Sequence, residues 1–385
     1  MYQAPLAEEY TSATPKELSE RIQTAKEQLG ERVVVLGHHY QRDEIVAHAD
    51  YLGDSYKLAK DAAVHPEAQY IVFCGVHFMA ESADILTPSS QAVILPNLAA
   101  GCSMADMASQ FQVRSAWKAL AQHLGEIEPK GSAFPRESEG HAIVPVTYMN
   151  SAANLKAFVG EHGGTVCTST NADRALEWAF ARGEKVLFFP DQHLGRNTGL
   201  RMGLDPERDM GLWDPFKPLG GNSPEKLSRA RLLLWKGHCS VHKRFTVAQI
   251  EKARAEHPRV RVIVHPECPM EVFLSADESG STESILKAVR QSEPGTVWAV
   301  GTEVNLVKRL AAECADKTVF CLDPEICPCS TMYRIHPGFL CWVMESLARG
   351  EVVNRVTVPE DVAHWARLAL QRMLEIGPAA TSIAG

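Results

Sequence analysis

Four of the ten cysteines in this chain lie in segments whose composition predicts turns. Cys102 and Cys239 each follow a glycine-containing stretch, and Cys327 and Cys329 flank Pro328. A cysteine in a turn can present its sulfur to a ligand, and the thiolate form is a strong ligand for iron and zinc. Three such thiolates, one from each third of the chain, could converge on one metal centre and leave one coordination position open.

The spacing of these cysteines leaves several kinds of site open. The sequence contains no Cys-x-x-Cys pair, so a four-sulfur zinc site or a typical ferredoxin motif has no support. The remaining alternatives are buried thiols, a zinc site that includes His238 or His242, and an iron–sulfur cluster with an open iron. The corresponding alternative functions are a zinc hydrolase that uses His238, His242 and His265, and a non-catalytic redox sensor. Four further cysteines lie in apolar segments and are expected to be small buried side chains: Cys74, Cys167, Cys314 and Cys341.

Polar side chains follow the short apolar stretches of the chain. They are hydroxyls, an amide, two imidazoles and a carboxylate: His38, Tyr40, Ser55, Tyr148, Asn150, Ser169, His265, Glu267 and Thr282. In parallel α/β sheets, ligands bind beyond the carboxyl ends of the strands, which is where these residues are expected to lie. Together they predict a shared pocket for a small, highly oxygenated substrate.

Three of these hydroxyls lie where helical patterns begin. Ser55, Ser169 and Thr282 stand at helix starts, where free N–H groups and the positive end of the helix dipole attract carboxylate or phosphate. Serine and threonine are also common helix caps, so a purely structural role is the alternative for each. Their occurrence at three equivalent places favours anion binding. If they are only caps, Arg196 or Arg201 is the alternative anion clamp.

Short apolar runs followed by helical periodicity predict the elements that must position these residues. Strands are expected at 33–36, 70–74, 143–147, 165–168, 186–189, 260–264 and 297–300. Such runs suit strands that are buried on both faces of a parallel sheet. A capping box at Thr14 and Glu17 predicts a helix that ends at Gly30, and further helices are expected to begin at Ser223 and Thr246.

This strand-and-helix pattern recurs three times, with His38, Tyr148 and His265 at corresponding positions about one small α/β domain apart. Any α/β chain repeats strands and helices, but the sequence favours three pseudo-repeated α/β/α sandwich domains with short parallel sheets around a central active site. The expected domains are residues 1–113, completed by C-terminal helices in 330–385, then 114–240 and 241–329. Segments 126–140 and 195–222 are rich in Gly, Pro and charge and are expected to be surface insertions or lids rather than sheet.

Composition excludes several classes of protein. The 385 residues are 45% hydrophobic and 22% charged, with 39 Lys and Arg against 47 Asp and Glu and a net charge of −8. These values are ordinary for a globular protein and give no sign of a nucleic-acid or membrane partner. No apolar run is long enough to cross a membrane, and the first residues lack an export pattern. We expect a cytoplasmic protein, in which ten cysteines do not indicate disulfides.

The ordered motifs of the chain closely resemble those of the quinolinate synthase family, bacterial enzymes of de novo NAD biosynthesis. The matches extend from His38 to the region around Met344. They comprise His38-His39-Tyr40-Gln41, Gly53-Asp54-Ser55, Phe78-Met79-Ala80-Glu81, Gly101-Cys102-Ser103-Met104-Ala105-Asp106, Tyr148-Met149-Asn150-Ser151, Cys167-Thr168-Ser169, His238-Cys239-Ser240-Val241-His242, His265-Pro266-Glu267-Cys268, Gly280-Ser281-Thr282 and Gly301-Thr302-Glu303.

The resemblance implies a three-domain fold and a [4Fe-4S] cluster that is held by one cysteine per domain, with a fourth iron open to substrate. Carried over to this chain, the ligands are Cys102, Cys239 and Cys329, with Cys327 as the alternative to Cys329. The family's third cysteine is followed three residues later by methionine, which fits Cys329-Ser330-Thr331-Met332. The insertions make this chain a longer form of the family.

The resemblance also implies the reaction, in which iminosuccinate (iminoaspartate) and dihydroxyacetone phosphate condense to quinolinate with loss of phosphate and two waters. Glu267, beside His265, is then the candidate general base of this transferase, and His38 and Tyr40 are candidates for proton delivery. The implied substrate-binding residues are His38, Ser55, Tyr148, Met149, Asn150, Ser169, His265, Pro266, Glu267 and Thr282. The implied partners are the two substrates and, transiently, the L-aspartate oxidase that makes the unstable imine.

Overall fold

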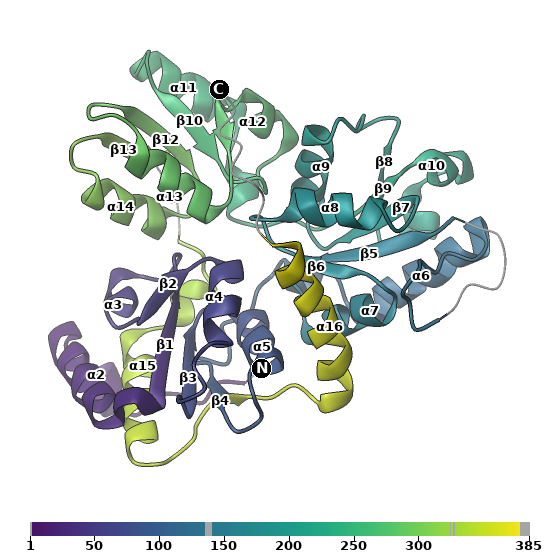
Figure 1. The fold of residues 1–385 in the computed structure, drawn as a ribbon. Coiled ribbons are helices and arrows are strands. Elements are labelled where there is room, and N and C mark those ends of the chain that lie inside the picture. Colours follow the sequence, from purple (N-terminus) through teal and green to yellow (C-terminus); the bar gives the residue numbers. More distant parts are fainter. Residues whose placement is uncertain (1, 135–140, 324, 326–327, 378–385) are drawn as a thin grey trace.

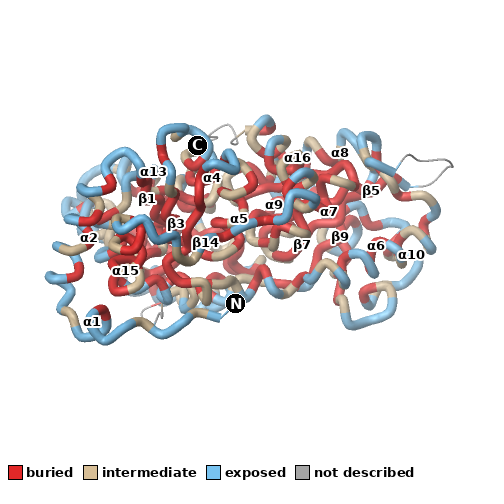
Figure 2. Tube along the Cα trace, turned by 90° about the horizontal axis from the view of Figure 1, so that it is seen from below, coloured by how far each residue is buried: buried red, intermediate tan, exposed pale blue. Residues whose placement is uncertain are grey.

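Three β-sheets, each packed between helices, form three lobes that lie around a common centre (Figure 1). The computed structural model describes residues 2–134, 141–323, 325 and 328–377. Viewed from below, the molecule is flat, with buried strands inside and exposed helix surfaces along the edges (Figure 2). The predicted α/β fold of three pseudo-repeated sandwiches with short, mainly parallel sheets is confirmed.

The first lobe contains a five-stranded sheet in the order β14-β4-β3-β1-β2. Its strands are β1 (Val33–His38), β2 (Tyr51–Gly53), β3 (Tyr70–Cys74), β4 (Ala92–Ile94) and β14 (Arg355–Val356). Its helices are α1 (Glu8–Thr11), α2 (Pro15–Leu29), η1 (Gly30–Arg32), α3 (Asp43–Val46), α4 (Ser55–Ala62), α5 (His77–Leu86) and α15 (Pro337–Ala348). Only β14, from the C-terminal region, runs antiparallel to its neighbour in this sheet.

The first long helix, α2, begins and ends where the sequence predicts. The Thr14 hydroxyl accepts the Glu17 N–H at 3.3 Å, and the Glu17 carboxylate accepts the Thr14 N–H at 2.8 Å. Gly30 ends the helix with a φ of 55°, a left-handed conformation that glycine adopts without steric cost. The capping box and the terminal glycine therefore fix the length of the helix that covers the outer side of the first lobe.

The second lobe has a five-stranded parallel sheet in the order β6-β5-β7-β9-β8. Its strands are β5 (Ile143–Tyr148), β6 (Thr165–Cys167), β7 (Lys185–Phe189), β8 (Met210–Trp213) and β9 (Leu232–Trp235). Its helices are η2 (Ala105–Met107), α6 (Gln110–Leu124), α7 (Ala153–Glu161), α8 (Ala172–Phe180), α9 (Gln192–Arg201), η3 (Pro218–Gly221) and α10 (Pro224–Arg229). Every residue of β5, β7 and β9 is buried, as expected for strands covered on both faces.

The third lobe has a four-stranded parallel sheet in the order β11-β10-β12-β13. Its strands are β10 (Arg261–Val264), β11 (Glu278–Ser279), β12 (Val297–Gly301) and β13 (Thr318–Cys321). Its helices are η4 (His242–Arg244), α11 (Val247–Glu256), α12 (Met270–Ser275), α13 (Thr282–Gln291) and α14 (Val304–Glu313). The helix η5 (Met332–Arg334) follows and leads back to the first lobe.

The three sheets share one local topology. In each, a central strand (β1, β5 or β10) pairs on one side with the next strand and on the other side with the strand after that. A helix follows each of these two neighbours: α4, α8 and α13 on one side, and α5, α9 and α14 on the other. The repeat therefore gives topologically equivalent positions in the three lobes.

The expectation for segment 195–222 is wrong, because this segment contributes to the second sheet. It contains the end of α9, the edge strand β8 and η3. Met210 and Trp213 of β8 are buried, and a Cβ atom added to Gly199 would lie 2.8 Å from the Met210 methyl carbon. The glycines thus reflect close packing rather than a mobile lid. Of segment 126–140, residues 126–134 form a loop beside α6 and α7, and residues 135–140 lie outside the described part.

The C-terminal region is shared between two lobes. α15 packs on α2, and β14 extends the first sheet, but α16 (Glu360–Ile376) packs chiefly on α7 and lies against β6 of the second lobe. Figure 1 shows α16 in yellow between these two lobes. Among the described residues, no helix has the length and apolar character needed to cross a membrane.

Candidate active site

One pocket lies where the carboxyl ends of the central strands of the three lobes meet. Its lining includes all nine predicted polar residues and three predicted cysteines: His38, Tyr40, Ser55, Tyr148, Asn150, Ser169, His265, Glu267, Thr282, Cys102, Cys239 and Cys329. His38 and Tyr148 end β1 and β5, and His265 directly follows β10. Cys327 falls outside the described residues. The predicted convergence of these side chains on one pocket is therefore present in the fold.

Two of the expected substrate-binding residues are not in the pocket lining. The Met149 sulfur accepts a hydrogen bond from the Ser82 hydroxyl at 3.4 Å, so this side chain faces α5. The Pro266 carbonyl accepts the Asn197 side-chain amide at 2.8 Å, which ties it to α9. Both residues are neighbours in sequence of residues that do line the pocket, and these hydrogen bonds hold that part of the chain in place.

The carboxylate of Glu267 anchors a buried hydrogen-bond network. Its Oε2 lies 2.5 Å from Nδ1 of His242, and the Tyr148 hydroxyl also bonds to it. The other ring nitrogen of His242 lies 3.1 Å from the Thr302 hydroxyl, which lies 2.9 Å from the Tyr40 hydroxyl. The network thus connects residues of all three lobes and offers a route for protons along the pocket wall.

Burial and charge fix the protonation states of Glu267, Tyr40 and Tyr148. Burial raises the pKa of Glu267, but the neighbouring His242 and His265, together with its hydrogen bonds to His242 and Tyr148, outweigh burial and hold this pKa below its usual range. Burial raises the pKa of Tyr40 and of Tyr148 well above the ordinary value for tyrosine. At neutral pH, Glu267 is therefore an acceptor, and both tyrosines keep their protons.

His38 and His265 have equivalent hydrogen bonds at the ends of equivalent strands. Nδ1 of His38 accepts the Tyr40 N–H at 3.1 Å, and Nδ1 of His265 accepts the Glu267 N–H at 3.3 Å. Burial lowers the pKa of each ring to about 3. Each is therefore a neutral imidazole whose proton is on Nε2, which leaves one N–H free to donate to a bound oxygen.

The three helix-start hydroxyls are not the capping groups of their helices. The Asp54 carboxylate caps α4 by accepting the Lys57 N–H at 2.9 Å, and the Ser281 hydroxyl caps α13 by accepting the Ser284 N–H at 3.3 Å. Ser55 and Thr282 occupy the next position, and Ser169 lies in the turn before α8. These three hydroxyls line the pocket, and Ser55 and Thr282 do so at helix starts that a neighbour already caps.

The pocket lining offers neutral donors but, among the described lining residues, no Lys or Arg. The side-chain oxygen of Asn150 is buried and has no hydrogen-bond partner, so it is available to a bound molecule. Arg196 bonds to Gln192, and Arg201 lies over the ring of Phe273. Neither arginine is in the pocket lining, so the described lining residues do not support an arginine clamp.

Comparison with known proteins shows the family of this chain. Residues 20–375 match the family model described as Quinolinate synthetase A protein (NadA). The quinolinate synthase of Corynebacterium glutamicum is 58% identical over 378 residues, which cover 98% of this chain and 92% of that protein. Those of Nocardioides sp. and Geobacillus kaustophilus are 54% and 50% identical and cover 94% and 95% of this chain and 90% and 95% of those proteins. The chain belongs to the quinolinate synthase family.

In this member of the quinolinate synthase family, three cysteines begin three equivalent turns. The carbonyl oxygens of Cys102, Cys239 and Cys329 accept the N–H of the fourth following residue at 3.2, 3.0 and 2.9 Å, respectively. A short 3₁₀ helix, η2, η4 or η5, begins three residues after each cysteine. The recurrence of one turn at three places identifies Cys329 as the structural counterpart of the other two cysteines.

The three cysteines of these turns are half-buried and line the pocket. Burial raises the pKa of Cys102 to about 12 and that of Cys239 well above its usual value. Main-chain N–H groups that point at both sulfurs offset part of this effect. Without a bound cation both groups are thus thiols, whereas a metal ion would bind them as thiolates.

The residues that line the pocket do not include all three histidines of the zinc site considered above, His238, His242 and His265. His238 is outside the pocket lining, whereas His242 and His265 stack with ring centroids 4.3 Å apart. A different donor set is present, because ligand atoms of Cys239, His242 and Glu267 lie within 4.8 Å of one another. Cys268 is buried, its sulfur donates to the Gly301 carbonyl at 3.7 Å, and it is not among the residues that line the pocket.

Some pocket residues of this family member were not predicted as parts of the pocket. They are Asp54, Val76, Phe78, Met79, Thr168, Val241, Thr331 and Met332, together with His242, which was considered only as a zinc ligand. The apolar members, Val76, Phe78, Met79, Val241 and Met332, make part of the lining apolar. Their sequence signal is weak, because apolar residues after a buried strand are equally typical of a core.

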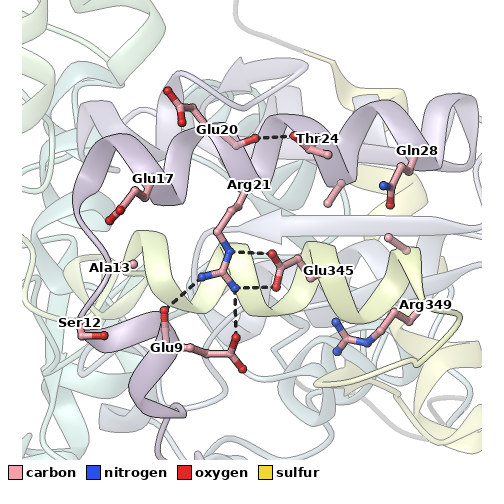
Figure 3. A pocket seen from close by; sticks show the side chains of 12 residues that line it. Glu9, Ser12, Ala13, Glu17, Glu20, Arg21, Thr24, Gln28, Glu345 and Arg349 are labelled. Atoms are coloured by element: carbon pink, nitrogen blue, oxygen red, sulfur yellow. Dashed lines mark hydrogen bonds and ion pairs between the residues drawn. The ribbon is translucent and has the colours of Figure 1, made fainter.

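A second pocket, the outer groove, lies on the outside of the first lobe between α2 and α15 (Figure 3). Arg21 donates two hydrogen bonds to the Glu345 carboxylate at 2.8 and 2.9 Å and a third to the Glu9 carbonyl. The Tyr10 hydroxyl donates to the same Glu345 carboxylate at 2.8 Å. Most charged groups in this groove face solvent or are paired with one another.

Proposed function

We propose that the chain catalyses the synthesis of quinolinate. In this reaction it condenses iminosuccinate with dihydroxyacetone phosphate and releases phosphate and water. The observation that carries the proposal is the meeting of three equivalent cysteine turns, one associated with each lobe, at a pocket lined by neutral hydrogen-bond donors. Both substrates are small anions rich in oxygen, which matches this inventory. The product would enter the biosynthesis of NAD.

The cysteines fit a [4Fe-4S] cluster better than a single metal ion. Three sulfurs from three separate turns suit a cluster with one open iron, because each turn supplies one ligand in an equivalent way. Cys102, Cys239 and Cys329 would hold the cluster, which supplies Lewis-acid chemistry at its open iron. The set of Cys239, His242 and Glu267 uses one of these sulfurs and leaves the other two without a role.

Glu267 and His242 would move protons as a pair. The reaction requires removal of protons from carbon and nitrogen and their return to leaving hydroxyls. A carboxylate whose pKa is held below its usual range is a weak base by itself, but it orients His242 and stabilises the charge this ring gains with a proton. The Thr302 and Tyr40 hydroxyls continue the proton path beyond His242.

The neutral donors would hold the substrate oxygens. The N–H groups on Nε2 of His38 and His265 can donate to carbonyl or carboxylate oxygens without adding charge. Ser55 and Thr282 stand at helix starts, where main-chain N–H groups and the helix dipole favour an anion. The free side-chain oxygen of Asn150 can accept from an amino or hydroxyl group of the substrate. A transient contact with L-aspartate oxidase would shorten the path of the unstable imine.

Anaerobic purification tests the proposal. We expect about four iron and four sulfide per chain, and quinolinate formation only when both substrates are supplied. Zinc without sulfide would favour the zinc-hydrolase alternative, which is then tested by hydrolase assays of the same sample. A full cluster without quinolinate formation would contradict the proposed reaction and favour a redox sensor.

A further inference from the structure

Two of the three cysteine turns are tied to a buried carboxylate at the start of a helix. Asp191 is fully buried and precedes α9. Its Oδ1 accepts the Leu194 N–H at 2.7 Å, which caps the helix. Its Oδ2 accepts the main-chain N–H of Cys239 at 3.1 Å. One carboxylate therefore joins the start of α9 to the cysteine turn.

Glu303 makes the same connection in the third lobe. It is fully buried and precedes α14. Its Oε2 accepts the Asn305 N–H at 2.8 Å and the Leu306 N–H at 3.2 Å, which caps the helix. Its Oε1 accepts the main-chain N–H of Cys329 at 3.3 Å. This second oxygen also accepts the side-chain amide of Asn305 at 3.2 Å, so a cysteine N–H is again one of its donors.

The two carboxylates occupy topologically equivalent positions. Asp191 lies between β7 and α9, and Glu303 lies between β12 and α14, which are corresponding elements of two lobes. The corresponding residue of the first lobe is Val76, between β3 and α5, which makes no side-chain cap. There the His77 N–H donates to the Ala100 carbonyl at 2.8 Å, so main-chain hydrogen bonding holds the segment before the cysteine.

Helix capping does not explain why these residues are acidic. A cap needs one oxygen, and serine, threonine or asparagine supplies it without a buried charge. Burying a carboxylate is costly unless both oxygens are bonded. At Asp191 and Glu303 the second oxygen is bonded, and in both cases a cysteine N–H is among its donors. The residue type is thus matched to the cysteine turn.

We propose that Asp191 and Glu303 are paired positioning residues, which hold the Cys239 and Cys329 turns in the geometry that retains the cluster. This inference rests on the proposed cluster and adds a role that the reaction itself does not require. The carboxylates act through the main chain of the ligands. They leave the sulfur free to bind iron, and they fix the direction in which it points.

Conservative amide variants separate positioning from capping. In Asp191→Asn, the side-chain oxygen can continue to cap α9, but the amide nitrogen replaces the oxygen that faces Cys239. Glu303→Gln makes the equivalent change at Cys329. The control is Ser223→Ala, which removes the cap of α10, a helix at the outer end of the second lobe (Figure 1). Each protein is prepared anaerobically with reconstituted cluster.

The measurements are the melting temperature of the iron-free protein, the rate of iron loss to an excess of chelator and the electron paramagnetic resonance spectrum of the reduced cluster. We expect both amide variants to melt within a few degrees of the wild type, to lose iron about tenfold faster or more, and to have altered spectra. Ser223→Ala is expected to keep the wild-type rate and spectrum.

Two results overturn the inference. Amide variants that lose iron at the wild-type rate with unchanged spectra would show that the carboxylates are helix caps only. Variants whose iron-free forms melt far below the wild type, without faster iron loss, would show a general structural role. A wild-type protein that takes up no iron and sulfide would instead contradict the proposed function, so the two failures are distinguishable.

Discussion

The central pocket and the outer groove between α2 and α15 contain similar groups in different surroundings. In the pocket, Glu267 bonds to His242 and Tyr148, and the Glu267 and His242 side chains are 3% and 1% exposed. In the groove, Glu345 bonds to Arg21 and Tyr10, and the side chains of its ion pair are 22% and 30% exposed. Each carboxylate therefore has one basic and one phenolic partner.

The difference lies in what the basic partner can do. Arg21 keeps its proton at every accessible pH, so its pair with Glu345 can only fix the arrangement of two helices. His242 is an imidazole, a type of side chain that can serve as a general acid or base, and burial removes the water that would otherwise screen its pair with Glu267. Partner type and burial, rather than the number of charged groups, therefore distinguish a site suited to proton transfer from a structural ion pair.

The strongest test of the pocket removes its sulfurs. We expect loss of the cluster in each of three variants, Cys102→Ala, Cys239→Ala and Cys329→Ala. Each variant lacks one of the three proposed thiolate ligands, and the proposed ligand set contains no fourth thiolate that could replace it. Cys268→Ala is the matched control, and it should keep its iron because its sulfur points to a main-chain carbonyl. Iron and sulfide analysis and visible absorbance measure the effect. A brown Cys329→Ala protein beside a colourless Cys327→Ala protein would assign the third ligand to Cys327.

The second test removes the carboxylate of the pocket and leaves its shape. Glu267→Gln should keep the cluster and lower turnover by roughly 10²- to 10⁴-fold, because the charge that supports His242 is lost. The equivalent change in the groove, Glu345→Gln, should leave turnover nearly unchanged. Steady-state kinetics of both variants at equal iron content measure this contrast. Equal turnover in the two variants would remove Glu267 from the mechanism.

A third and smaller effect is expected at the helix-start hydroxyls. Each of Ser55→Ala, Ser169→Ala and Thr282→Ala should weaken substrate binding about tenfold, because each removes one neutral donor to an anionic group. Iron content and melting temperature should stay unchanged, since Ser55 and Thr282 do not cap their helices. The readout is KM for each substrate. Unchanged KM and kcat in all three variants would contradict anion binding by these groups.

The smallest effect is expected in the groove. Arg21→Met should lower the free energy of unfolding by about 1 kcal/mol at neutral pH, because a partly exposed pair is screened by solvent. The hydrogen bonds from Arg21 hold the pKa of Glu345 below its usual range. The contribution of this pair is therefore complete above the ordinary pKa of glutamate and is lost as pH falls through the lowered value. Urea unfolding across this range measures it, and a difference that persists at the acidic end would contradict the assignment to Glu345.

The strands and the principal site residues could be predicted because their signals are local. The runs that became β1, β3, β5, β7, β10 and β12 are short and apolar, and polar residues follow each one at the sheet edge where ligands bind. The sequence also contains a local signal for the third cysteine turn. Cys102, Cys239 and Cys329 are each followed by serine, whereas Cys327 is followed by proline. This shared pair of residues marks the repeated turn and distinguishes the two neighbouring cysteines.

The remaining features depend on contacts between distant segments. β8 was missed because its four residues lie among glycines that pack against Met210 and Leu234 rather than in a loop. The partnership of Glu267 with His242 joins residues 25 positions apart through the fold. Asp54 and Ser281 are residue types that favour helix caps, but only the fold shows that the hydroxyls of the neighbouring Ser55 and Thr282 line the pocket.

The order in which the chain is synthesised has a consequence for the first lobe. Its sheet begins with β1 but is completed only by β14, and α16 covers α7 later still. All described pocket residues, the last of which is Met332, are therefore synthesised before β14. At that stage the edge of β4 that pairs with β14 is still exposed. Open strand edges recruit other chains. A product of premature termination before Arg355 is thus expected to aggregate rather than to act as a partial enzyme.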